Sequence, residues 1–145
     1  MSFADEVLDF SNHAIEVTDD ITRVSAIALF SDVVISTPVG NPSLWSSKAP
    51  AGYTGGSLRG SWFATISRPS SQLADASREN SAISSMENIV LGAKSARLFY
   101  MTNNQPYSKR VEYDGWSSQA PDGMVRKNTA RWDSIVKEIS GNMSI

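Results

Sequence analysis

An apolar stripe in the first part of the chain constrains the fold more than any other feature. Its side chains recur in steps of three and four, which is the spacing of one face of an α-helix. They are Val7, Phe10, Ala14, Val17, Ile21, Val24 and Ala28. Ile27, Phe30 and Val34 widen the stripe toward its end, so we expect that half to be buried on more than one side. The pattern predicts a helix from Phe3 to about Ser36.

Local preferences set the limits of this helix. Thr37-Pro38 ends it, because the residue before a proline is disfavoured in the helical region. Acidic side chains near the start suit the positive end of the helix dipole. Residues 17–20, Val-Thr-Asp-Asp, are weak helix formers. A break near Asp19 into two helices is therefore an open alternative.

Residues 38–60 predict a long loop. They hold three prolines and five glycines, a density that excludes regular structure for most of the segment. Loops of this length in compact domains tend to be functional or disordered. Leu44, Trp45 and Tyr53 argue for order, and we expect them to dock on a neighbouring surface of the same chain or of another copy.

Two segments rich in β-forming residues predict an antiparallel pair of strands. They are residues 62–67 and 97–102. Between them, apolar residues at helical spacing predict a short helix over residues 80–91, with Gly92 as its C-cap. After the second strand, Pro106 can begin a helical turn that runs to about Tyr113 and stops at Gly115.

A second apolar face predicts a helix near the C-terminal end of the chain. Its residues are Met124, Val125, Asn128, Trp132, Ile135, Val136 and Ile139. We expect this helix to run from Gly123 to Gly141. The sequence therefore predicts one α+β domain over residues 1–145. In it, the long N-terminal helix and the C-terminal helix pack on a small antiparallel β-sheet, and a Pro/Gly-rich loop is inserted at about 38–60.

The composition argues against DNA wrapping, secretion and membrane insertion. The 13 basic and 15 acidic side chains give a formal net charge of -2, whereas proteins that grip duplex DNA carry a clustered excess of Lys and Arg. The chain has no cysteine, which suits a reducing cytoplasm. We find no basic leader before an apolar run and no window of about 18 apolar residues, so we expect neither secretion nor a membrane span.

No residue cluster predicts catalysis or metal binding. His13 lies beside acidic residues on the predicted first helix and has no partner motif. Residues 52–57 are rich in glycine but lack the Gly-Lys-Ser/Thr ending of a phosphate loop. The carboxylate pairs within 19–20 and 112–114 are typical of solvated surface. We therefore expect no enzymatic activity, no cofactor and no metal site.

The segment from Asn104 to Arg126 combines turn-forming residues, three aromatic side chains and alternating charges. This composition, without a nucleophile and its base, indicates a segment of fixed shape. Gly115 and Gly123 permit backbone conformations that other residues resist. Upstream, we expect Arg59 to anchor structure together with Trp62, although arginine is also enriched at interfaces.

Charge is distributed unevenly along the chain. The predicted first helix is acidic, while the second half has a mild basic bias. The basic residues concerned are Arg97, Lys109, Arg110, Arg126, Lys127 and Arg131. Opposite faces could attract neighbouring copies into a head-to-tail ring. Ordinary solvated charge is an equally open interpretation.

Four blocks follow one another in a recognisable order. They are Thr37-Pro38-Val39, the segment from Gly56 to Trp62, the segment from Asn103 to Gly115, and the run Ser-x-Gln-Ala-Pro-x-Gly-Met-Val-Arg from Ser117 to Arg126. With the amphipathic N-terminal helix, these blocks resemble a family of tailed-bacteriophage neck and tail-completion proteins. The resemblance covers most of the chain from about residue 30 onward, and residues 40–54 depart from the family pattern.

The resemblance implies a virion structural protein that forms a ring, expected to be hexameric, at the junction of the tail tube with the head connector. Its implied partners are further copies of itself, the tail tube or tail-terminator protein, and the head connector or adaptor proteins. DNA would pass through the lumen without specific binding, and the ring would be assembled in the host bacterial cytoplasm. The alternatives are a head-closure, adaptor or tail-terminator ring of the same neck and, in another class, a small DNA-binding regulatory protein.

The resemblance also marks the residues expected to form the structural or interface motif. They are Pro38, Arg59, Trp62, Pro106, Tyr107, Glu112, Gly115, Trp116, Gln119, Pro121, Gly123 and Met124. For Tyr107, Glu112 and Trp116 two roles are open. They either buttress the block internally, which the family pattern favours, or form contacts between subunits.

Overall fold

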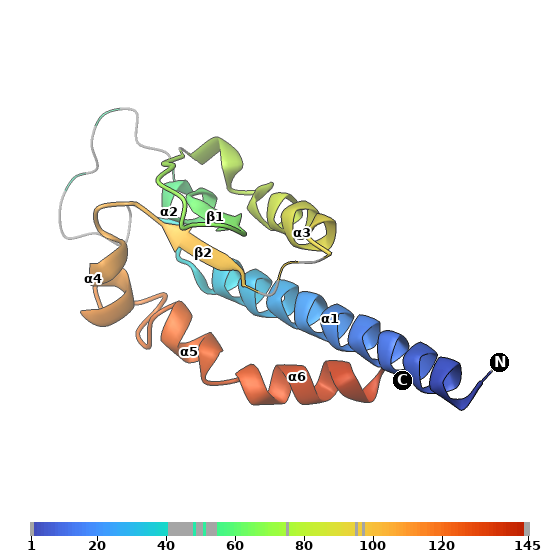
Figure 1. The fold of residues 1–145 in the computed structure, drawn as a ribbon. Coiled ribbons are helices and arrows are strands. Elements are labelled where there is room, and N and C mark those ends of the chain that lie inside the picture. Colours follow the sequence, from blue (N-terminus) through green and yellow to red (C-terminus); the bar gives the residue numbers. More distant parts are fainter. Residues whose placement is uncertain are drawn as a thin grey trace.

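A long helix and a two-stranded antiparallel sheet organise the fold (Figure 1). The computed structural model describes residues 2–40, 48, 51, 55–74, 76–94, 96 and 98–143. Most of the predicted loop, including Leu44, Trp45 and Tyr53, therefore lies outside the described residues. Its final residues form a single helical turn, α2 (Ser57–Gly60). Within the described part of the chain, no helix has the length and apolar character that crossing a membrane requires.

Helix α1 (Phe3–Ser36) is continuous through 34 residues, which corresponds to a length of about 51 Å. It begins with a capping box: the Ser2 hydroxyl accepts from the Asp5 N–H at 3.2 Å, and the Asp5 carboxylate accepts from the Ser2 N–H at 3.0 Å. Thr37 is extended, as the following proline requires. The prediction of one helix is confirmed, and the alternative with a break near Asp19 is wrong.

The weak helix formers in the middle of α1 are accommodated by local hydrogen bonds. The Thr18 hydroxyl donates to the Ala14 carbonyl at 2.8 Å, and the Thr22 hydroxyl donates to the Thr18 carbonyl at 3.0 Å. A threonine that bonds to the carbonyl four residues earlier keeps its hydroxyl satisfied without leaving the helix. The continuous apolar stripe therefore outweighs the low propensity of residues 17–20.

The two predicted strands pair as expected. Strand β1 (Trp62–Thr65) lies antiparallel to β2 (Tyr100–Asn103), with Trp62 opposite Asn103 and Thr65 opposite Tyr100. Both strands are shorter than predicted. β1 ends early because the Thr65 hydroxyl donates to the Arg68 carbonyl at 2.5 Å and the chain bends away.

Helix α3 (Ala82–Gly92) packs on both β1 and α1. Ala82, Met86 and Val90 are its buried face, and they meet Phe30, Val33 and Val34 of α1 and Trp62 of β1 in one core cluster. Burial of each such large side chain is worth about 1.5–3 kcal/mol. The predicted helix is thus confirmed, with Gly92 as its last residue and Ala93 as the cap. A short 3-10 turn, η2 (Ala76–Arg78), precedes α3 and contacts α2.

Three helices follow β2: α4 (Ser108–Tyr113), α5 (Val125–Thr129) and α6 (Trp132–Gly141). The prediction of one helix from Gly123 to Gly141 is wrong, because the chain turns at Ala130 and Arg131. The Asn128 side chain, 2% exposed, donates to the Asp32 carbonyl at 3.3 Å and the Ser36 hydroxyl at 2.9 Å, which fixes α5 against the end of α1.

Helix α6 then runs back along α1, on the side away from the sheet (Figure 1). Its buried residue is Ile135, and Trp132, Val136 and Ile139 are half-buried. Thus α1 is sandwiched between the sheet with α3 on one side and α6 on the other. The C-terminal helix packs on the long helix, while the sheet is covered by α3.

Candidate functional site

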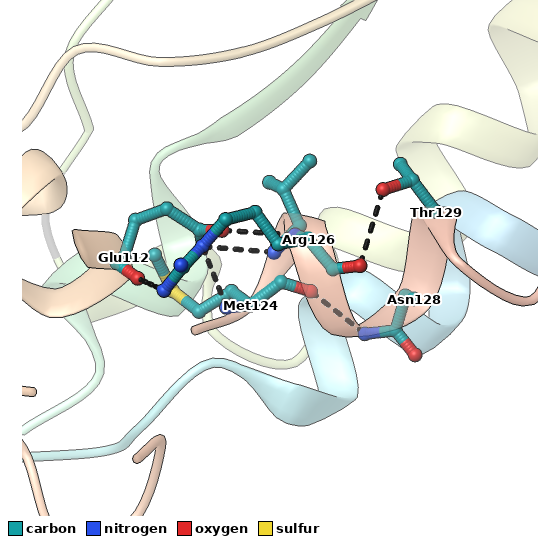
Figure 2. Close-up of polar contacts among 6 residues, drawn as sticks. Glu112, Met124, Arg126, Asn128 and Thr129 are labelled. Carbon is teal, nitrogen blue, oxygen red and sulfur yellow. Dashed lines mark hydrogen bonds and ion pairs between the residues drawn. The ribbon is translucent and has the colours of Figure 1, made fainter. Parts of the chain in front are cut away.

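The centre of the Asn104–Arg126 segment is a carboxylate that caps a helix. Glu112, at the end of α4 and 6% exposed, accepts backbone hydrogen bonds from Met124 at 2.6 Å, Val125 at 2.9 Å and Arg126 at 2.8 Å (Figure 2). These N–H groups belong to the first turn of α5, where no intrahelical acceptor exists. The Glu112 side chain therefore fixes the start of α5 against α4.

The same hydrogen bonds keep Glu112 ionised. Burial alone would raise the pKa of this carboxyl, but the three backbone N–H groups and the Arg126 side chain together outweigh burial and lower the pKa below its ordinary value. Arg126 Nε lies 3.2 Å from Glu112 Oε1. A negative charge at a helix N-terminus is also favoured by the helix dipole. Glu112 thus acts as an ionised structural cap.

The close approach of the Glu112 carboxylate requires a glycine at position 123. The φ of Gly123 is +85°, in the left-handed region, and a Cβ built there would meet Glu112 Oε1 at 2.7 Å and the Glu112 carbonyl oxygen at 2.8 Å. Both the backbone conformation and the close contact exclude other residues without a rearrangement. Gly115 has φ +60° but open space around it, so there only the conformation selects glycine.

The loop between α4 and α5 is held at both ends. The Arg126 guanidinium donates to the Glu112 carbonyl and lies 4.9 Å from the centre of the Tyr113 ring. Within the loop, Ala120 and Met124 enter the core at 3% and 1% exposure. Successive turns form where the Ala120 N–H donates to the Ser117 carbonyl and the Gly123 N–H to the Ala120 carbonyl. Gln119 and Pro121 are exposed on the outside of these turns.

A second cluster closes the C-terminal end of α1. Arg59 donates to the Thr37 carbonyl at 2.8 Å and to the Ile35 carbonyl at 3.2 Å, and Trp62 Nε1 donates to the Thr37 hydroxyl at 2.8 Å. Carbonyls at a helix C-terminus lack intrahelical donors, and the Arg59 guanidinium supplies hydrogen-bond donors to these two. Pro38 is buried beside this cluster. The structure therefore brings Pro38, Arg59 and Trp62 together as a C-terminal cap.

Three polar residues with long-range roles were missed by sequence reasoning. Arg78 donates to the carbonyls of Gly60 at 2.5 Å and Trp62 at 3.1 Å. Gln105 Nε2 donates to the Ser61 hydroxyl at 2.9 Å and the Ala74 carbonyl at 3.1 Å. Asn128 ties α5 to α1 as described above. Only Asn128 carried a signal, since it is a polar residue within a predicted apolar helical face.

The remaining motif residues lie at the surface of α4 and the loop after it. Tyr107 packs against the core cluster, and its ring centre lies 6.0 Å from that of Trp116. Trp116 itself is 58% exposed, with the Arg110 guanidinium 5.6 Å from its ring centre. Pro106, which precedes α4, is exposed. We call the exposed group Lys109, Arg110, Tyr113 and Trp116 the α4 surface.

The structure provides no assembled reactive centre among the residues it describes. No three His, Cys, Asp or Glu side chains of that set come close enough to hold a metal ion. A shallow groove of about 460 Å³ lies between β1 and α3. Its lining residues, which include Ile66, Asn88 and Ile89, are without an ionisable side chain.

The site therefore consists of two helix caps. Glu112 with Gly123 fixes the start of α5, and Arg59 with Trp62 fixes the end of α1. The Glu112 cap also joins α4, and with it the α4 surface, to α5. Compared with known proteins, the chain matches no family model, no curated protein and no solved structure.

Proposed function

We propose that this chain is an assembly protein of a tailed bacteriophage that forms a closed, hexameric ring at the head–tail junction and joins the tail tube to the head connector. The proposal rests on the observation that the motif residues fall into two groups, those that fix the backbone and those that are exposed. Glu112, Gly123 and Met124 fix the backbone of the block, while Trp116 and Tyr113 remain exposed at 58% and 63%. A rigid block that presents aromatic and basic side chains has the character of an interface.

Fixed shape is what a ring subunit needs. Each copy in a cyclic ring makes the same contact, so a small change in the angle of the presenting surface would prevent closure. The Glu112 cap holds α4 and α5 together because one carboxylate accepts four hydrogen bonds. The resemblance to neck and tail-completion proteins, carried by these same residues, supports the position at the head–tail junction. A head-closure, adaptor or tail-terminator ring would use the same surface.

The charge distribution disfavours the DNA-binding alternative. Lys109 and Arg110 of the α4 surface are exposed, but Asp114 and Asp122 are exposed nearby, and the net charge of the chain is -2. Tight duplex binding requires several Lys or Arg contacts to phosphates. A lumen with a few basic side chains would let DNA pass without gripping it.

Two measurements test the proposal together. Native mass spectrometry of the full chain, alone and with a purified tail tube or head connector, should give a closed oligomer of a single stoichiometry. Filter binding to duplex DNA, titrated with salt, should give weak binding at all salt concentrations. A chain that stays monomeric in every mixture, or that binds DNA tightly with a steep salt dependence, would overturn the proposal.

A further inference from the structure

The first three turns of α1 form an exposed extension, residues 2–13, which we call the N-terminal arm. Every residue of the arm is exposed, whereas the first buried residue of α1 is Arg23. Yet the arm carries large apolar side chains: Phe3 is 81% exposed, Phe10 65% and Leu8 58%. Large apolar side chains gathered on an exposed surface are typical of an interaction site, so the arm is suited to contact a partner surface.

The exposed side chains of the arm continue a stripe that is covered further along. Phe3, Val7 and Phe10 lie on one helical face with Ala14, Val17 and Ile21, because the steps between them are three and four residues. The latter three are half-buried, and α6 packs along α1. The apolar stripe thus extends beyond the part that the chain itself covers.

Charge distinguishes the arm from the rest of the chain. The first 22 residues, which include the arm, contain six carboxylates, three of them in the arm, and no Lys or Arg, so the residues after them carry a formal charge of +4 within a total of -2. Glu6, Asp9 and Glu16 lie on one side of α1 next to the apolar stripe, since they are spaced by three and seven residues. A partner for the arm should therefore combine apolar or aromatic area with positive charge.

The α4 surface has this combination. Tyr113 and Trp116 supply exposed aromatic area, and Lys109 and Arg110 supply positive charge beside them. Figure 1 shows the start of α1 and α4 at opposite ends of the molecule. The arm therefore cannot reach the α4 surface of its own chain, and a contact between the two must join different copies.

We propose that the N-terminal arm docks, through its apolar stripe and acidic flank, onto the α4 surface of a neighbouring copy. The contact is head-to-tail, and a head-to-tail contact closes into a ring when its rotation permits. This inference deepens the proposed ring function and rests on it, because it names the surfaces by which neighbours meet.

The area of the contact predicts a weak pairwise interaction. A buried phenylalanine contributes about 150–250 Å², so Phe3 and Phe10 with Val7 supply less than the roughly 800 Å² per partner of a standard stable interface. Closure of a ring makes the last contact intramolecular and strengthens the whole assembly. Covalent cross-linking is therefore the suitable way to detect the contact between the arm and the α4 surface.

The absence of cysteine in the chain permits a clean cross-linking test on the full-length protein. The variant Ser11→Cys/Ser118→Cys places thiols at exposed positions beside Phe10 and Trp116 and leaves both of these side chains in place. Treated with a short bis-maleimide, it should give a ladder of covalent oligomers that ends in a closed species. The matched control is Ser11→Cys/Ile89→Cys, which places the second thiol in the groove between β1 and α3, where Ile89 is 45% exposed. We expect no ladder from the control.

Three results would overturn the docking proposal: a ladder only with Ile89→Cys, a dimer from Ser11→Cys alone, which would mean that arms pair with one another, or no cross-link in any variant. Charge exchange gives a second criterion. Glu6→Lys/Asp9→Lys should reduce cross-linking at least tenfold, and adding Lys109→Glu/Arg110→Glu should restore it.

The experiments distinguish a failure of the docking proposal from a failure of the ring proposal. A closed ring without the cross-link between positions 11 and 118 would contradict the docking site and leave the ring function standing. Open-ended ladders with that cross-link, but without a closed species, would contradict the ring and support the contact.

Discussion

Glu112 accepts a hydrogen bond of 2.6 Å from the backbone N–H of Met124, and this contact joins the end of α4 to the start of α5 across a loop without regular structure. Met124 is itself 1% exposed, so the donor has no access to water. Removal of the acceptor would leave a buried N–H without a partner. The orientation of the α4 surface therefore depends on this carboxylate.

Substitution of Glu112 should destabilise the fold without a change in the core. Glu112→Gln retains the shape but presents an NH₂ group to backbone donors, so we expect a loss of about 2–4 kcal/mol in the free energy of unfolding. Urea denaturation measures the change. The matched control is Asp114→Asn, which removes a charge from an exposed neighbour and should cost less than about 0.5 kcal/mol. Equal losses for both variants would refute the capping role.

The two left-handed glycines of the block should respond differently to alanine. Gly123→Ala introduces both an unfavourable φ and a contact of 2.7 Å with Glu112, and we expect it to cost more than about 2 kcal/mol. Gly115→Ala introduces only the unfavourable φ in open space, at about 1 kcal/mol. Thermal unfolding of the two variants gives the order, and a larger loss at position 115 would contradict the structure.

The pKa of Glu112 predicts a pH dependence of stability. Because hydrogen bonds lower this pKa in the folded chain, the unfolded chain takes up the proton at higher pH. The stabilisation is complete above the ordinary glutamate pKa of about 4.3 and is lost as the pH falls through the lower folded pKa. The difference in unfolding free energy between the natural chain and Glu112→Gln should therefore shrink below about pH 4. A difference that stays constant down to about pH 2 would rule out this assignment.

The C-terminal cap of α1 should appear as a coupling between Trp62 and Thr37. Trp62→Phe removes the indole N–H that donates to the Thr37 hydroxyl at 2.8 Å, and Thr37→Val removes the acceptor. Each single change should cost about 1–3 kcal/mol, and the double variant should cost less than their sum by about 1 kcal/mol. Strict additivity in the double-mutant cycle would show that the bond contributes nothing.

Sequence periodicity predicted the elements whose signal was local. The stripe of α1, the β-rich segments around Trp62 and Tyr100, and the apolar face of α3 each follow from spacing within one segment. The division of the C-terminal helix did not, because it depends on Asn128 bonding to Asp32 and Ser36, which are distant in sequence. Long-range polar contacts leave no periodic trace.

The same distinction between local signals and long-range contacts applies to the candidate site. Gly123 and Glu112 stood out as residue types in a recognisable order, but their contact depends on how α4 and α5 meet. Arg78 and Gln105 bond to backbone carbonyls. Because every segment has backbone carbonyls, the sequence does not indicate which of them a side chain will contact. Sequence reasoning therefore marked the block but missed the contacts of Gln105, which belongs to it, and of Arg78, which holds the start of β1.

The proposed ring at the neck is tested most directly by cryo-EM reconstruction of virions from the phage proposed to carry this chain. We predict a closed ring of identical subunits between the tail tube and the head connector, into which the structure described here fits with the N-terminal arm against the α4 surface of the adjacent copy. A neck in which no density fits this chain, together with a purified protein that remains monomeric, would contradict ring formation.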